Sequence, residues 1–326
     1  AVLAGICLLR AHGLWSQARI AAQDQSTADR RAAYMLPTVD RRAITGPYWL
    51  LAAFGAVLLA FVSAATVLTV NVAWIDHASH HVQLLALVGG IGLIVRAMIG
   101  RPRGDAQPTE AVDPRLHIPR WEWLLLLAIC AGALLVRVYR LNTSITAMVD
   151  EVNFISGVLW YWEFPDVPLM ESMSQVIPFP RLYNYLQSVT MAVFGRDFLG
   201  FRAASALTGA ATVAATWWLA RHLFDRRLAL FAALVLATLP PHVHFSRIAL
   251  NNIVDPLFGT LTFAYIARGL LTGKRVDFVL AGLMFGLTQY FFEAGRLLYP
   301  PILIVWLGWV WLVDRHRFNR VLLPHL

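Results

Sequence analysis

The chain has 326 residues, of which 58% are hydrophobic and 14% are charged, and its mean hydropathy is +0.60. Apolar runs near the length that crosses a bilayer recur along it. A soluble globular protein is excluded, because such runs would leave no face for water. The net charge of +8 comes from basic residues scattered among short connectors, a pattern typical of membrane-protein loops that does not favour nucleic-acid binding.

Residues 1–120 are predicted to hold about three membrane spans and a linker. The apolar segment 1–9 is interpreted as the tail of the first span, and segments 48–72 and 82–99 as the second and third. Residues 96–120 are rich in Arg and Pro, which indicates a domain boundary. Because the chain starts without Met inside an apolar run, we expect it to be part of a longer protein.

Residues 121–326 are predicted to form a second membrane domain, incomplete at its C-terminus. It opens with an apolar helix over 121–139, and the loop over 140–202 is longer than a connector needs, which is usual for a functional loop. Later spans are expected at 203–219, 228–245, 253–266, 278–292 and 297–313. The predicted fold class is all-α: a polytopic transmembrane bundle whose first long loop carries interfacial helices.

Segment 182–194 is interpreted as a helix lying at the membrane interface. Its apolar face is Leu182, Tyr185, Leu186, Val189 and Val193, and its polar face is Asn184, Gln187 and Ser188. If this helix crossed the membrane, every later Arg-rich connector would lie on the outer side of the membrane instead of the cytoplasmic side. With it at the interface, seven of the 27 Lys and Arg residues fall outside, so the charge bias places the 140–202 loop outside the cytoplasm, with a bacterial inner membrane as the expected location.

The predicted outer side gathers acids, arginines and histidines at the ends of apolar helices. Charged groups are costly there, so they suggest a functional site, although interface anchors and loop salt bridges are the alternative. The members are Asp150, Glu151, Arg181, His242, His244, Arg247, Asn251, Asn252, Asp255, Glu293 and Arg296. His77, His80 and His81, like His242 and His244, are spaced to bind a metal ion or are ordinary interface histidines.

The order of several motifs resembles a known family. An apolar helix is followed by the pair Asp150-Glu151, the interface helix, and the run GRDFLGFRAASALTG at 195–209. LARHLFDRR at 219–227 and FSRIAL at 245–250 come next. This order, over about 121–313, resembles the GT-C superfamily of polytopic glycosyltransferases, in its protein O-mannosyltransferase and aminoarabinose transferase branch.

The resemblance implies transfer of a sugar from a polyprenyl-phosphate donor to a lipid, glycan or protein acceptor on the extracytoplasmic side, with inversion. It implies catalysis by Asp150 with Glu151 as its helper, and a divalent metal ion near Asp150 as a candidate cofactor. Where relatives place a second acid this chain has Asn252, and Asp255 is the nearest acid, about one helical turn on.

The residues themselves suit this chemistry. An acceptor hydroxyl needs a base, the anomeric carbon passes through an oxocarbenium-like state, and the leaving phosphate needs cations such as Arg. Arg181, Arg247 and Arg296 are expected to converge on that phosphate. The candidate substrate-binding residues are Arg181, Tyr183, His244, Arg247, Asn252, Asp255 and Arg296.

Two other functions and one other role for Asp150 remain open at this point. The chain also fits a non-catalytic GT-C-like subunit that docks a larger membrane complex, or a lipid-linked transporter or flippase. Apolar residues at 154, 155, 158 and 159 predict a helix directly after the acid pair. Asp150 is therefore also a candidate N-cap for that helix.

Overall fold

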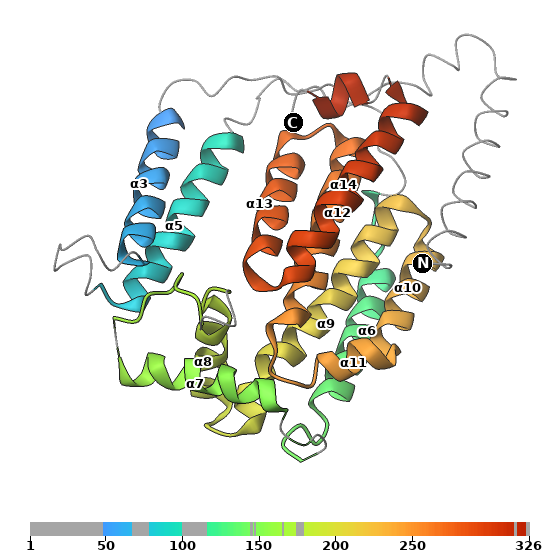
Figure 1. Cartoon of the computed structure of the whole chain (residues 1–326). Helices are drawn as coiled ribbons and strands as arrows, with labels where there is room; N and C mark the ends of the chain where they lie inside the picture. Colours follow the sequence, from blue (N-terminus) through green and yellow to red (C-terminus); the bar gives the residue numbers. More distant parts are fainter. Residues whose placement is uncertain are drawn as a thin grey trace, which may run out of the picture. The chain divides into compact units, whose positions relative to one another are not determined.

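The computed structural model describes residues 48–66, 78–99, 116–143, 146, 148–164, 166–173, 179–315 and 318–323. The chain divides into two compact units, 1–38 and 39–326. The first unit, with the span expected at 1–9, lies outside the described residues, as does His77. The described part of the second unit is all-α, which confirms the predicted fold class (Figure 1).

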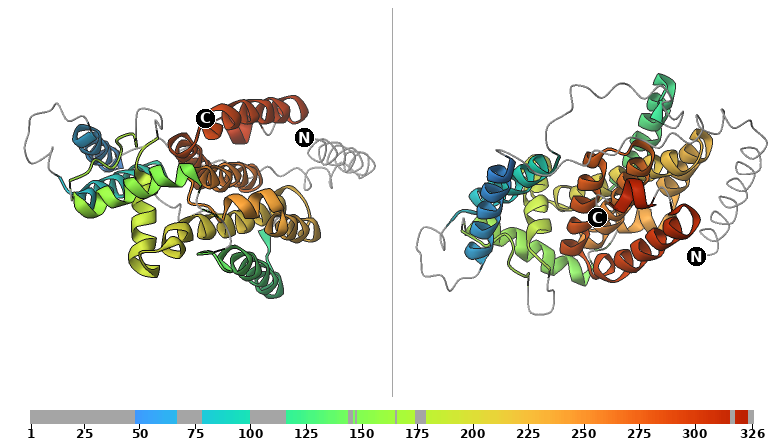
Figure 2. Two further views of the ribbon diagram at one scale, coloured as in Figure 1. Left: turned by 60° about the horizontal axis from the view of Figure 1, so that its bottom comes forward. Right: turned by 90° about the horizontal axis from the view of Figure 1, so that it is seen from above.

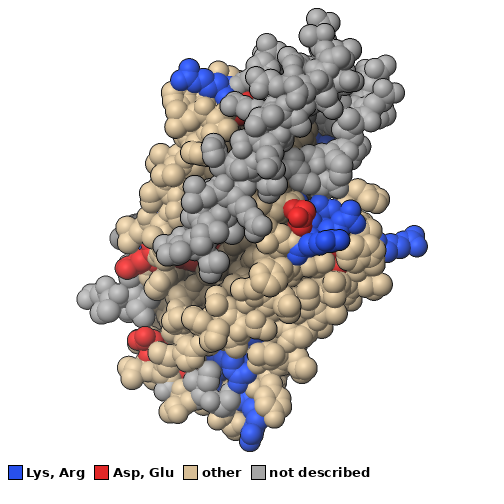
Figure 3. Space-filling view, turned by 90° about the vertical axis from the view of Figure 1, so that its right-hand side faces the viewer, with Lys and Arg blue, Asp and Glu red and all other residues tan. Residues whose placement is uncertain are grey.

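Five of the described helices are long and apolar enough to cross a bilayer, so the protein is an integral membrane protein. They are α3 (Tyr48–Thr66), α5 (His80–Ile99), α6 (Arg120–Val138), α9 (Phe198–Leu223) and α14 (Glu293–Val313), each at a predicted span. Large apolar side chains such as Leu124 and Leu127 of α6 are exposed on them. Figure 3 shows a face on which most described residues are uncharged, as lipid contact requires.

The remaining predicted spans form helices that are shorter or more polar than these five. α12 (Val254–Thr272) is less apolar, and α13 (Arg275–Phe291) is shorter. The span predicted at 228–245 is not one continuous helix, because it divides into α10 (Arg226–Thr238) and α11 (Pro240–Phe245). A proline lacks an N–H and forces the residue before it out of the α conformation, and Leu239 accordingly has ψ 114°.

α9 is the central helix and packs against α6, α10, α12 and α8 (Leu182–Phe194). Its sequence is rich in Ala, Gly and Thr, which allow neighbouring backbones to approach closely. A Cβ at Gly209, for example, would lie 2.1 Å from the hydroxyl oxygen of Ser246, in the loop after α11. The apolar core around α9 therefore depends on small side chains.

Each end of α9 carries a buried arginine bound to an acid on another helix. Arg202 pairs with Glu151 of α7 (Val149–Glu163) at 2.7 Å, and Arg221 pairs with Glu122 of α6 at 2.8 Å. All four side chains are at most 3% exposed. Since a charge buried without a partner is strongly unfavourable, the two pairs fix α9 relative to both α6 and α7.

α7 and α8 lie at the end of the bundle where α5 begins, with α7 running across it (Figures 1 and 2). At 13 residues, α8 extends about 20 Å, less than the roughly 30 Å of a bilayer's hydrocarbon core. Its polar residues Asn184 and Gln187 are fully buried against the protein, whereas Val193 is 69% exposed. The polar face of α8 therefore turns inward and its apolar face outward.

α3 and α5 form a hairpin whose helices cross at two glycines. A Cβ at Gly55 would lie 2.7 Å from the carbonyl oxygen of Gly90, and a Cβ at Gly90 would lie 2.9 Å from that of Gly55. Neither position has room for a side chain, so the close crossing requires glycine on both helices. Gly92, two residues after Gly90, has no atom within 4 Å of its Cβ position.

Replacing Gly90 by Leu is expected to force α3 and α5 apart and to lower the free energy of unfolding by about 1–3 kcal/mol, the usual effect of overpacking. Gly92→Leu adds the same side chain to open space and is the matched control. Unfolding in a titration with denaturing detergent measures both variants. Equal stability of the two variants would show that the glycine crossing does not hold the hairpin.

Candidate active site

The start of α7 separates the two adjacent acids. Met148, the residue before the helix, is extended with φ −82° and ψ 148°. Glu151 stands at the third helical position, and its Oε2 accepts a hydrogen bond of 3.0 Å from the N–H of Met148. Asp150, at the second position, is exposed. The expectation that Asp150 caps the helix is therefore wrong, because Glu151 reaches back to the helix start instead.

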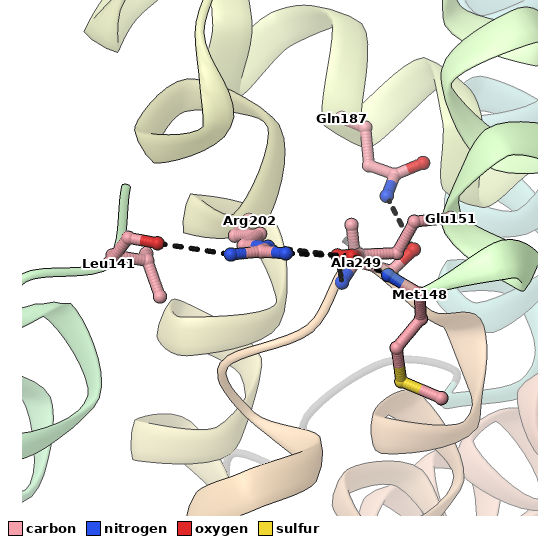
Figure 4. A network of polar contacts seen from close by, with 6 residues as sticks. All are labelled: Leu141, Met148, Glu151, Gln187, Arg202 and Ala249. Atoms are coloured by element: carbon pink, nitrogen blue, oxygen red, sulfur yellow. Dashed lines mark hydrogen bonds and ion pairs between the residues drawn. The ribbon is translucent and has the colours of Figure 1, made fainter. Parts of the chain in front are cut away.

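The Glu151 carboxylate is the centre of a buried network (Figure 4). Arg202 donates to both oxygens, from Nε to Oε1 at 2.9 Å and from a terminal nitrogen to Oε2 at 2.7 Å. The N–H of Ala249 adds a bond of 2.7 Å to Oε1. Arg202 also donates to the carbonyl of Leu141 at 3.1 Å. The network joins the segment after α6, the start of α7, the start of α9 and the loop after α11.

These contacts decide the protonation of Glu151. Burial raises the pKa of Glu151, but the hydrogen bonds from Arg202, Ala249 and Met148 together outweigh it, so its pKa lies below the ordinary glutamate value. A carboxylate has about four acceptor positions, and four donors occupy them here. Glu151 is thus an ionised structural group, not a base. Its stabilising effect is present at neutral pH and is lost as pH falls through its lowered pKa.

Asp150 differs from Glu151 in its exposure and in its bonding. It is exposed, and it has no hydrogen bond or ion pair with any described residue. The neighbours of Asp150 in the chain, Glu151 and Val152, line a pocket of about 260 Å³ that Asp150 itself does not line. Its other lining residues are mostly apolar, with Asp197 as a second acid. Arg196 also lines this pocket, and its guanidinium stacks on the ring of Trp162 at 4.2 Å.

The three arginines expected to share one phosphate occupy separate environments. Arg181 pairs with Glu171 at 2.8 Å and stacks on Trp160. Arg247 donates to two carbonyls at the C-terminal end of α6, at 2.5 and 2.8 Å. Arg296 donates to the carbonyl of Gln289 at 2.7 Å and lies over the ring of Phe179. In the structure these three arginines therefore do not form one cluster around a common phosphate site.

The other candidate residues divide between structural contacts and exposed positions. Tyr183 is buried, with its hydroxyl 2.6 Å from that of Ser205, and burial raises its pKa above the ordinary tyrosine value. His244 is exposed on α11. Asn252 is half-buried, and its Oδ1 has no hydrogen-bond partner among the described residues.

Asp255 has a structural role at the start of α14. Its carboxylate accepts a bond of 2.6 Å from the N–H of Gly295, the third residue of that helix. The residue that precedes α14, Phe292, provides no side-chain cap. Asp255 thus caps α14 from α12. The sequence offered no signal for this contact, because the two residues are 40 positions apart.

Three members of this site were not among the predicted site residues. They are Arg202, the backbone N–H of Ala249, and Arg196. Arg202 had a usable signal, because an arginine inside an apolar helix requires a partner. Ala249 had none, since a backbone donor leaves no trace in a sequence.

A resident metal ion does not fit the described residues. Within the parts of the chain that the structure describes, no three His, Cys, Asp or Glu side chains gather closely enough to hold an ion. His242 has another role, because its Nδ1 lies 2.9 Å from the Arg137 guanidinium. Burial, and secondly the charge of Arg137, lower the pKa of His242 to about 4, so it stays neutral at physiological pH.

Comparison with known proteins finds a match for the C-terminal part of the chain. Residues 179–326 match the family model described as dolichyl-phosphate-mannose-protein mannosyltransferase. This part of the chain is therefore similar to a GT-C superfamily domain, and we call residues 179–326 the GT-C domain. No curated protein and no solved structure gives a significant match to the chain.

The match confirms the resemblance and supports a membrane glycosyltransferase of the GT-C type. The matched GT-C domain includes α8, Arg202 of α9, and the loop that carries Ala249. Asp150 and Glu151 precede it in the chain. Through Arg202 and Ala249, however, the GT-C domain supplies two of the groups that hold the start of α7 in place.

Proposed function

We propose that the protein transfers a sugar from a polyprenyl-phosphate donor to an acceptor, with inversion and with Asp150 as the base. The proposed reaction takes place on the extracytoplasmic side of the membrane, and the expected location of the protein is a bacterial inner membrane. The observation that carries the proposal is the contrast between the two acids. Glu151 is fully engaged by four donors, whereas Asp150, one residue away, is exposed and has its carboxylate available.

In the proposed reaction Asp150 accepts the proton of an acceptor hydroxyl as that oxygen bonds to the anomeric carbon. The bond from this carbon to the phosphate oxygen breaks on the opposite face, and polyprenyl phosphate leaves with the electron pair. A negative leaving group requires a nearby cation, and we assign this role to Arg196 at the pocket beside α7. The apolar lining of that pocket suits the first isoprene units of the donor.

Arg202 makes an anionic donor tolerable next to Glu151. The guanidinium binds both carboxylate oxygens, so the pair is neutral as a unit. A phosphate in the pocket therefore meets the charge of Arg196 and no free carboxylate on Glu151. The other acid in the lining, Asp197, accepts hydrogen bonds from the N–H of Gly200 at 3.0 Å and from Asn142 at 3.1 Å. The rigid pair also fixes the start of α7, on which Asp150 stands.

Turnover of a defined donor tests the proposed activity. Membranes that contain the full chain are incubated with radiolabelled polyprenyl-phosphate mannose or aminoarabinose and with total membrane extract as acceptor. We expect release of polyprenyl phosphate and a product whose anomeric configuration, measured by NMR, is opposite to that of the donor. Donor that stays intact in every combination would favour the non-catalytic subunit, and movement of intact donor across the membrane would favour a flippase.

The proposed orientation predicts which residues a membrane-impermeant maleimide reaches. With Cys7 and Cys130 replaced by Ala, Glu163→Cys on α7 is expected to react in intact spheroplasts, because Glu163 is exposed on the Asp150 side. Arg226→Cys, at the opposite end of α9 and also exposed, is expected to react only after the membrane is opened. The reverse labelling would place Asp150 in the cytoplasm.

A further inference from the structure

A second pocket lies far from Asp150, between the α3–α5 hairpin and the GT-C domain. It has a volume of about 480 Å³ and is lined by ten residues of α3, α5 and α13, of which Arg275 is the only charged one. Leu59 of α3, Ile91 of α5 and Leu283 of α13 are among the apolar residues. We call it the hairpin groove.

The hairpin groove has the depth of about one membrane leaflet. Along α5 it runs from Ile91, in the middle of the helix, to Met98 near its C-terminal end, or roughly 10 Å. Along α13 it runs from Leu283 to the first residue, Arg275, or roughly 12 Å. Half of a bilayer's hydrocarbon core is about 15 Å thick. An apolar groove of this depth fits an acyl chain from one leaflet.

The mouth of the groove is basic. Arg275 lines this end of the groove, and Lys274 precedes it in the chain. Arg96, in the last turn of α5, has its guanidinium 5.2 Å from the centroid of the Tyr48 ring. The carboxylate of Asp277, two residues after Arg275, lies 3.4 Å from Arg268 and accepts a hydrogen bond of 2.6 Å from Thr272. Cations at the boundary of a leaflet attract anionic lipid headgroups. The charge at the mouth therefore complements a phosphate.

The groove opens at the end of α5 opposite to Asp150. The first residue of α5, His80, packs its ring 5.0 Å from that of Tyr161 on α7, the helix that carries Asp150. Met98, at the groove mouth, lies 18 residues later on the same helix, or about 27 Å away. A lipid seated in the hairpin groove is therefore not the donor that reaches Asp150.

We propose that the hairpin groove binds an anionic phospholipid, with one acyl chain between the hairpin and α13 and its phosphate at Arg275. The lipid fills the space between the α3–α5 hairpin and the GT-C domain. The acyl chain thereby contacts both the α3–α5 hairpin and α13 and stabilises their packing.

Native mass spectrometry of the full chain, purified in neutral detergent with equimolar phosphatidylglycerol and phosphatidylcholine of the same acyl chains, tests this proposal. We expect wild-type protein to retain phosphatidylglycerol. Arg275→Gln is expected to lower its retention about tenfold, the effect of losing one charge-assisted contact, and to leave phosphatidylcholine unchanged. Equal retention of both lipids by wild-type protein would overturn the assignment of the headgroup.

Two glycines of α13 provide a matched pair of variants for the acyl chain. Gly282 lines the groove and Gly286, one turn on, does not, and neither has an atom within 4 Å of its Cβ position. Gly282→Leu is expected to abolish retention of phosphatidylglycerol, whereas Gly286→Leu keeps it. Val279→Phe, which narrows the groove from the same helix, serves as a second filling variant.

Two outcomes would overturn the proposal. The first is equal retention of phosphatidylglycerol by Gly282→Leu, Val279→Phe and Gly286→Leu, with all three variants melting like wild-type protein. The second is that equimolar undecaprenyl phosphate displaces phosphatidylglycerol from wild-type protein, while Gly282→Leu retains no undecaprenyl phosphate. The groove would then be a binding site for a polyprenyl lipid.

Discussion

Replacing Asp150 by Asn is expected to lower the rate of sugar transfer by about a hundredfold or more, the usual contribution of a positioned general base. The amide has nearly the shape of the carboxylate but cannot accept the acceptor's proton. Because Asp150 is exposed and binds no described residue, its loss removes no internal contact. Initial rates with radiolabelled donor measure the loss, and thermal melting is expected to stay unchanged.

Glu163→Gln is the matched control for this variant. Glu163 is an exposed acid on the same helix, at its other end, so its neutralisation changes the charge of α7 by the same amount. Its transfer rate is expected to equal that of wild-type protein. Full activity of Asp150→Asn would remove the base from the mechanism and with it the case for an enzyme built around α7.

Replacing Arg202 by Met is expected to lower the free energy of unfolding by about 3–5 kcal/mol, because it leaves the buried Glu151 carboxylate without its cation. Arg202 is fully buried and Glu151 is 2% exposed, so water cannot replace the guanidinium. Arg226→Met, which removes an exposed arginine, is the control and is expected to change stability by less than about 0.5 kcal/mol. Unfolding in denaturing detergent measures both.

A double variant separates the ion pair from general damage to the core. In Glu151→Gln with Arg202→Met neither of these two positions carries a charge, and the amide oxygen is expected to accept from the N–H of Ala249. We expect the double variant to be more stable than Arg202→Met alone, so that the two effects are not additive. A double variant that loses the sum of both single effects would show that Glu151 and Arg202 act independently, contrary to their bidentate contact.

Local features of the sequence predicted the elements of the fold. α6 and α9 form where apolar runs of membrane length occur, and α8 forms where apolar residues follow helical spacing. The break inside the run at 228–245 was not predicted, because hydropathy alone does not register the backbone effect of Pro240 and Pro241. Length and apolarity predict that a segment enters the membrane, whereas proline decides whether it stays one helix.

The site was predictable only where its residues are neighbours in the chain. The sequence set Asp150 and Glu151 side by side with different expected roles, and the structure engages one and exposes the other. The separate partners of Arg181 and Arg247 could not be foreseen, since these partners come from other segments. A shared membrane side, inferred from charge, places residues at one end of a bundle but does not bring them into contact.

The two ion pairs of α9 also bear on how the chain is assembled during synthesis. Both acids, Glu122 and Glu151, precede the helix, so the ribosome has made them before either Arg202 or Arg221 emerges. When α9 enters the bilayer, an acid that was synthesised earlier is thus available to pair with the arginine at each of its ends. This pairing offsets the free-energy cost of inserting the two arginines. A nascent chain that stops before Phe198 lacks both arginines, so Glu122 and Glu151 are still without their partners from α9.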